Sequence, residues 1–137
     1  NDYYDCSVII AGFFEFNQLK TKWDGRGRAG TTDYVDTAMG TDPDELTAQS
    51  PIHNLDKIKS PIMIIHGKVD RRTPFDGAKR FVAALKKTDV DFEYHWYDHE
   101  GHGLYFNKNS SDQFKKVNRF LDSCDARPPL NPKVASR

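Results

Sequence analysis

The stretch Pro61-Ile-Met-Ile-Ile-His-Gly67 decides the fold, because it is a continuous apolar run set between a proline and a glycine. A strand with one face in water alternates between apolar and polar residues, and this run does not alternate. Both of its faces are therefore expected to be buried, as in a parallel sheet. Two further strands are predicted, an aromatic segment over residues 91–98 and a β-branched segment over residues 7–14.

A helix is predicted directly after the central run. Thr73 can cap it, Pro74 suits its first position, and Asp76 favours the positive end of the helix dipole. Its apolar residues recur at helical spacing: Ala78, Phe81, Val82 and Leu85. Such a stripe is typical of a helix that packs on one face of a sheet.

Further helices are predicted on either side of this unit. Ser110-Ser111-Asp112-Gln113 resembles a capping box. The helical stripe that follows it consists of Phe114, Val117, Phe120 and Leu121. Shorter helices are expected over residues 33–39 and 44–49, the second capped by Asp42. The order of strand, helix, strand and helix indicates the α/β class, with parallel strands and flanking helices.

Composition narrows the classes of function. The chain has 137 residues, the usual size of one domain, and carries 20 basic and 20 acidic residues. This balance excludes a strongly basic nucleic-acid binder, and no apolar run approaches the ~18 residues of a membrane span. Two cysteines exclude a disulfide-rich scaffold. Cys6 and Cys124 are expected to be two buried thiols, although their pairing is open.

Chemistry-bearing residues follow two of the predicted strands. Asp70 comes after the central run, and His102 comes after the aromatic strand within Glu100-Gly-His-Gly103. Loops after neighbouring parallel strands meet at the same edge of the sheet. A carboxylate there can orient an imidazole and stabilise its protonated form. Asp70 and His102 are therefore candidates for a catalytic pair, with a solvated aspartate and a loop histidine as the alternative.

Roughly residues 1–124, most densely residues 50–103, resemble the C-terminal part of the prolyl oligopeptidase family of serine peptidases. The resemblance rests on Ser50-Pro51, the run ending in His66-Gly67, Asp70 before Pro74, and Glu100-Gly-His-Gly103. It implies an α/β-hydrolase catalytic domain in which Asp70 is the triad acid and His102 the triad base. By the same resemblance, residues 1–125 form the C-terminal portion of that domain. Residues 126–137, with three prolines, read as a tail.

The chain departs from the family pattern at the nucleophile. A Gly-x-Ser-x-Gly elbow should precede the acid and the base, and no serine here has such flanking glycines. The chain is therefore expected to begin just after the missing serine and to be inactive alone. The resemblance implies a peptide substrate and no cofactor. Its partner would be the nucleophile-bearing remainder of the enzyme, which in this family usually includes a propeller domain.

Alternatives remain for the function and for single residues. A carboxylesterase or acyl hydrolase of the same fold is the second enzyme hypothesis, and a non-catalytic interaction module is the third. A metal site at His99 and His102 is disfavoured, because zincin histidines lie four residues apart on a helix. His66 is expected to be a core histidine. Arg71 and Arg72 are expected in a solvated turn, with the wall of a substrate cleft as the alternative.

Overall fold

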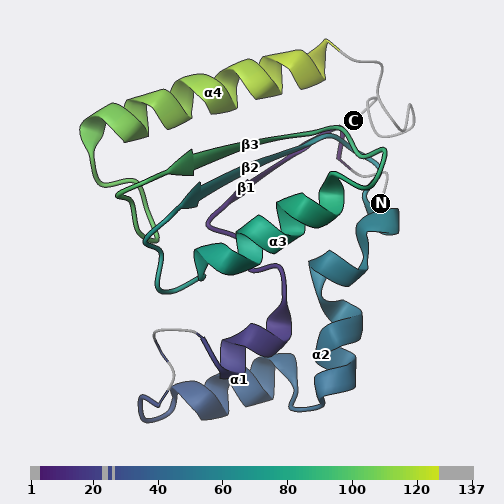
Figure 1. Ribbon diagram of the computed structural model, residues 1–137, viewed down its shortest axis with the longest axis vertical. Coiled ribbons are helices and arrows are strands. Elements are labelled where there is room, and N and C mark those ends of the chain that lie inside the picture. Colours follow the sequence, from purple (N-terminus) through teal and green to yellow (C-terminus); the bar gives the residue numbers. More distant parts are fainter. Residues whose placement is uncertain (1–3, 23–24, 26, 127–137) are drawn as a thin grey trace, which may run out of the picture.

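The computed structural model describes residues 4–22, 25 and 27–126. Within them a three-stranded parallel sheet runs in the order β1-β2-β3. The strands are β1 (Ser7–Ile10), β2 (Ile62–Gly67) and β3 (Phe92–Tyr97). The sheet lies between two helices, α3 (Phe75–Leu85) and α4 (Asn107–Asp125) (Figure 1). The predicted α/β class with parallel strands and flanking helices is confirmed.

The central position of β2 explains its unbroken apolar run, since every residue of this strand is buried. Ile62 and Ile64 face the core beneath α3, while Met63 and Ile65 face the core beneath α4. The α3 stripe predicted from the sequence fills the first core together with Phe14. Two separate apolar layers therefore hold one strand, as its sequence pattern predicted.

The first strand is shorter than expected. A strand was predicted over residues 7–14, but β1 ends at Ile10. Ala11 then adopts a φ of 51°, a left-handed conformation that does not continue a strand. The chain turns there, and Phe14 leaves the sheet to stack on Phe81 with ring centroids 4.2 Å apart.

The connection from β1 to β2 carries short helices, of which α1 and α2 lie away from the sheet in Figure 1. They are η1 (Phe16–Lys20), α1 (Thr31–Met39), α2 (Pro43–Gln49), η2 (Pro51–His53) and η3 (Leu55–Lys57). Asp42 caps α2 as predicted, since its Oδ1 accepts the Asp44 amide at 2.8 Å. Helix α1 begins two residues earlier than expected and has no buried residue.

Helix α4 corrects two expectations. It begins at Asn107, so the pattern Ser110–Gln113 lies inside the helix and is not its capping box. Phe120 is buried and Val117 packs against the core, whereas Phe114 and Leu121 are exposed.

A disulfide joins Cys6 to Cys124, with their Cα atoms 6.1 Å apart. The expectation of two buried thiols is therefore wrong. Residue 6 precedes β1, and residue 124 lies in the last turn of α4, which returns over the starts of the strands (Figure 1). The two cysteines become neighbours through this tertiary arrangement alone, because 118 residues separate them in sequence.

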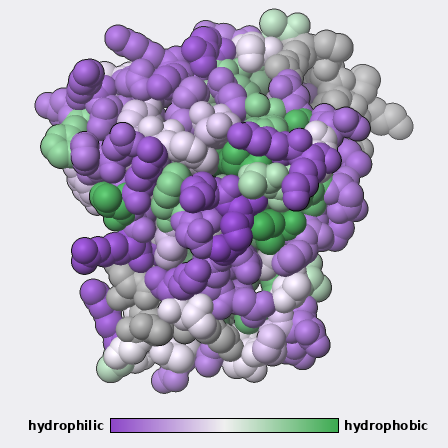
Figure 2. Space-filling view, viewed as in Figure 1, coloured by the Kyte–Doolittle hydropathy of each residue, from purple (hydrophilic) through white to green (hydrophobic). Residues whose placement is uncertain are grey.

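The surface is mostly hydrophilic on the face shown in Figure 2, with hydrophobic atoms gathered in small patches near the middle of the molecule. None of the helices in the described part of the chain has the length and apolar character that crossing a bilayer requires. Residues 127–137, which make up most of the predicted tail, lie outside the described residues; Ala126 closes α4.

Candidate active site

Two loops meet where β2 and β3 end. Gly67 and Tyr97 are partners in the register, so the loops that follow them leave the sheet at the same level. The Val69 amide donates to the Glu100 carbonyl at 3.1 Å, which joins one loop to the other. A Cβ on Gly67 would lie 2.2 Å from that same carbonyl oxygen, so the close approach requires glycine.

Asp70 is fixed within the first loop by bonds to both carboxylate oxygens. Its Oδ1 accepts the backbone amides of Arg72 at 2.8 Å and Thr73 at 2.9 Å. Its Oδ2 accepts the Thr73 hydroxyl at 2.7 Å. The carboxylate is fully buried, so these bonds replace the water that the charge would otherwise bind.

His102 reaches this carboxylate from the second loop. Its Nδ1 lies 3.0 Å from Asp70 Oδ2 and 3.2 Å from the Thr73 hydroxyl. The Thr73 hydroxyl donates to Asp70, so an Nδ1 proton is directed mainly to the carboxylate. The side chain of His102 is 35% exposed, whereas that of Asp70 is 0% exposed. The structure thus joins a buried acid to a partly exposed imidazole, and Nε2 remains the nitrogen that can accept a proton.

Burial by itself would raise the pKa of Asp70. The hydrogen bonds from Thr73, His102 and the Arg72 amide outweigh burial and hold this pKa below its ordinary value of 3.8. Asp70 is therefore ionised at neutral pH. A fixed negative charge at Nδ1 is the arrangement that stabilises an imidazolium formed by proton transfer to Nε2.

His66 is a buried core histidine, as expected. Its Nε2 lies 2.7 Å from the Thr73 carbonyl, and its ring is 1% exposed. Burial lowers the pKa of His66, although the Thr73 carbonyl and the nearby Asp70 act in the opposite direction. The neutral ring therefore donates to the Thr73 carbonyl and steadies the loop that holds Asp70.

Sequence reasoning missed two residues of this site. Thr73 was expected to cap α3, but Pro74 occupies the cap position and the Thr73 hydroxyl serves Asp70 instead. Glu100 was given no role, yet it is 0% exposed and accepts three hydrogen bonds. A sequence signal existed for Thr73, which follows Asp70 at the three-residue spacing of a side-chain-to-amide turn.

The remaining candidates lie at the surface of this edge. His99 is exposed and is not joined to the Asp70 carboxylate. Arg71 and Arg72 are also exposed, and with His102 and Tyr105 they line a hollow of about 310 Å³. In the described part of the chain, no three His, Cys, Asp or Glu side chains are grouped so that they could hold a metal ion.

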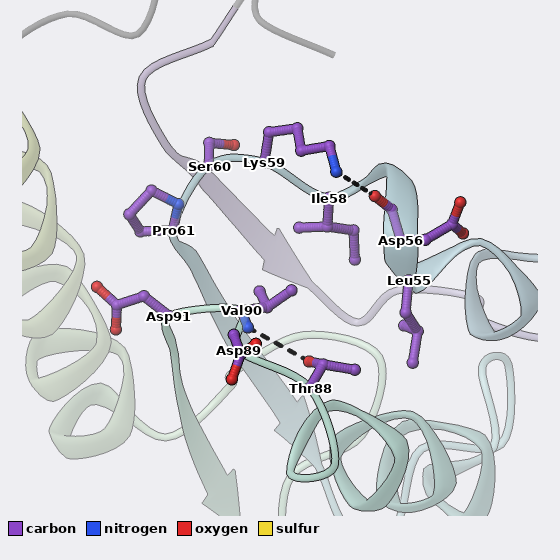
Figure 3. Close-up of a pocket in the computed structure, with 10 residues that line it drawn as sticks. All are labelled: Leu55, Asp56, Ile58, Lys59, Ser60, Pro61, Thr88, Asp89, Val90 and Asp91. Atoms are coloured by element: carbon purple, nitrogen blue, oxygen red, sulfur yellow. Dashed lines mark hydrogen bonds between the residues drawn. The ribbon is translucent and has the colours of Figure 1, made fainter.

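A larger hollow, of about 490 Å³, lies at the opposite end of the sheet, where β2 and β3 begin (Figure 3). Pro61 and Asp91, which directly precede the two strands, are part of its wall. Among the residues that line it, the Lys59 ammonium donates a hydrogen bond to the Asp56 carbonyl. The acid–base pair is therefore remote from this hollow, and its own surroundings are the smaller hollow beside His102.

Comparison with known proteins shows which family and which fold this chain shares. The chain is 38% identical over 79 residues to dipeptidyl peptidase family member 6 of Caenorhabditis elegans, covering 58% of this chain and 11% of that protein. It is 26% identical over 131 residues to dipeptidyl peptidase 4 of Sus scrofa, covering 91% of this chain and 16% of that protein. The chain therefore spans only a small part of the length of these relatives.

Among solved structures, an acylaminoacyl peptidase of Pyrococcus horikoshii superposes with a TM-score of 0.76 at 18% identity. The match covers 89% of this chain and 20% of that one, and it shows the α/β-hydrolase fold predicted from the sequence. The sequence profile of the prolyl oligopeptidase family matches residues 1–126. Because this match covers nearly the whole chain, the chain belongs to the prolyl oligopeptidase family.

Proposed function

We propose that this chain supplies the acid and the base of a serine peptidase that hydrolyses peptide bonds in short peptides. Asp70 is the acid, His102 is the base, and the nucleophilic serine lies upstream of residue 1. The observation that carries the proposal is the 3.0 Å contact between His102 Nδ1 and the buried Asp70 Oδ2. A buried acid joined to a half-exposed imidazole at the edge of an α/β-hydrolase sheet is the arrangement that proton transfer to Nε2 requires.

The reaction follows from this geometry. The serine hydroxyl attacks the peptide carbonyl while His102 Nε2 takes its proton, and Asp70 stabilises the imidazolium through Nδ1. The imidazolium then gives the proton to the leaving amine, and an acyl-enzyme remains. Water attacks the acyl group as His102 takes its proton, and the proton returns to the serine as the acid product leaves. The three residues end in their starting state.

A peptide substrate is favoured over an ester by the relatives. The proteins reported above carry the names dipeptidyl peptidase and acylaminoacyl peptidase, both of which describe the release of a short unit from a peptide. A role as a non-catalytic module is less favoured, because the His102 side chain is 35% exposed and lines a hollow instead of being buried as a purely structural contact would be.

A fluorophosphonate probe tests the proposal, because it reacts with a serine that a histidine has activated. The complete enzyme should be labelled at one serine upstream of this chain, and His102→Ala should abolish the labelling. The 137-residue chain alone should remain unlabelled under the same conditions. Labelling of a serine within the chain, located by mass spectrometry of the adduct, would show that the nucleophile is not upstream.

A further inference from the structure

We infer that Glu100 is a positioning residue that fixes the His102 loop against the start of α4, so that Nδ1 stays on Asp70. This inference rests on the proposed function, because it concerns how the base of that reaction is held. Glu100 does not approach the reacting atoms; it acts through the backbone on either side of His102.

The Glu100 carboxylate is bound on both oxygens although it is fully buried. Its Oε2 accepts the Tyr105 amide at 2.8 Å. Its Oε1 accepts the Phe106 amide at 3.1 Å and the Asn109 side-chain amide at 2.8 Å. A buried carboxylate is costly unless its oxygens are satisfied, so these three donors define one place for the side chain.

These bonds explain how α4 begins. Phe106 stands at the cap position and has no side-chain acceptor of its own. Glu100 binds the amide of Phe106 itself and that of Tyr105 just before it, and its negative charge suits the positive end of the helix dipole. Burial would raise the pKa of Glu100, but its three hydrogen bonds hold the pKa below the ordinary value of 4.5. The anchor is therefore charged at neutral pH.

His102 lies inside the loop that this anchor closes. The bond from the Tyr105 amide to Glu100 spans residues 100–105, and Gly101 pairs with Gly103 across the histidine. The Glu100 carbonyl also receives the Val69 amide, one residue before Asp70. One residue thus ties the base loop to α4 with its side chain and to the acid loop with its backbone.

The decisive variant is Glu100→Gln in the complete enzyme, because it keeps the shape and replaces one oxygen by an amide group. That group would face a backbone N–H, so the loop must shift to separate two donors. Since a displacement of about 1 Å can cost about 10²-fold in rate, kcat on a chromogenic peptide should fall ~10–100-fold with KM nearly unchanged. Asp98→Asn is the matched control, since Asp98 is an exposed carboxylate of the same loop.

A double-mutant cycle separates positioning from general stability. If Glu100 acts through His102, Glu100→Gln should change the residual rate of His102→Ala less than twofold. Multiplying losses in the double variant would overturn the inference. If Glu100→Gln keeps wild-type kcat while His102→Ala loses most of it, the inference about Glu100 is wrong and the proposed function still stands. Wild-type kcat in His102→Ala would overturn the proposed function as well.

Asn109→Asp provides a second variant if Glu100→Gln does not fold, as judged by near-ultraviolet circular dichroism. It places a second carboxylate next to Glu100 Oε1 and leaves the backbone donors and His102 unchanged. The repulsion should displace the anchor and lower kcat about tenfold, again with KM unchanged. Retention of wild-type kcat in this folded variant would contradict a positioning role for Glu100.

Discussion

Asp70→Asn in the complete enzyme is the sharpest test of the acid–base pair, because the structure predicts what the amide group will do. The asparagine oxygen should take the place of Oδ1, where it keeps both backbone donors, from Arg72 at 2.8 Å and Thr73 at 2.9 Å. The NH₂ group then takes the place of Oδ2, which faces the Thr73 hydroxyl and His102 Nδ1.

An NH₂ group at that place donates, so His102 Nδ1 must become the acceptor. The imidazole proton then resides on Nε2, and the ring cannot take a proton from the serine. In other triads this change costs about 10⁴ in kcat, or about 5 kcal/mol of transition-state stabilisation. Folding should lose only about 1 kcal/mol, since the Thr73 hydroxyl can accept from the amide and both backbone bonds remain.

Steady-state kinetics with a chromogenic peptide should therefore show kcat lowered about 10⁴-fold with KM changed little. Thermal unfolding should show a nearly unchanged midpoint. Asp98→Asn controls for loss of a carboxylate at this edge, because Asp98 is exposed and pairs with Lys68. If folded Asp70→Asn retains kcat within tenfold of the parent, the acid of the triad is another residue and the mechanism above is wrong.

Three further outcomes follow from the packing and the charges. Reducing the disulfide, or replacing Cys6 and Cys124 by serine, should lower the free energy of unfolding by up to about 5 kcal/mol, because the cross-link spans 118 residues. Denaturant titration with and without reductant measures this loss, and equal unfolding midpoints would refute the prediction. Gly67→Ala should lower the free energy of unfolding by about 1–3 kcal/mol, because the new Cβ would lie 2.2 Å from a backbone oxygen. Gly77→Ala is the control and should stay within about 1 kcal/mol of the parent, because its Cβ would meet only the end of a side chain at 3.3 Å. Equal losses in the two variants would contradict the close approach at Gly67. The free energy of unfolding should fall as the pH drops below 6.5, the ordinary pKa of histidine, because the unfolded chain binds a proton at His66 that the folded core resists. His66→Gln should remove that part of the pH dependence when unfolding is measured from pH 7 to 5. An unchanged profile in this variant would contradict the prediction.

The parts that could be predicted from the sequence depend on neighbours along the chain. The buried strand at residues 61–67 and the stripe of α3 follow from hydrophobic patterning, and both are confirmed. The meeting of Asp70 and His102 follows from the rule that neighbouring parallel strands present their loops at one edge.

The parts that were missed depend on which of several partners a group finds in the folded chain. The start of α4 is anchored by Glu100, which binds the amide of the cap residue Phe106, and the local capping pattern at Ser110 lies inside the helix. Thr73 gives its hydroxyl to Asp70 and leaves the cap of α3 to Pro74. Cys6 and Cys124 are neighbours only in the assembled fold, since 118 residues separate them in sequence. In each case a group has two possible partners, the local capping or burial rule names one of them, and the folded structure selects the other.

Within the described part of the chain, the contacts that hold the acid and the base come from one βαβ unit and the helix after it. Asp70 is bound from residues 72, 73 and 102, and Glu100 from residues 105, 106 and 109. None of these partners lies on β1 or on the helices between β1 and β2. The geometry of the pair is thus set within this unit, and a serine brought to the same edge would meet a base already aligned. Preorganisation of this kind lowers the cost of reaching the transition state, because the imidazole need not be reoriented during the reaction. The same reasoning separates two kinds of damage: changes around β1 should weaken the fold and spare the alignment, whereas changes at Thr73 or Glu100 should reduce kcat in a protein that remains folded.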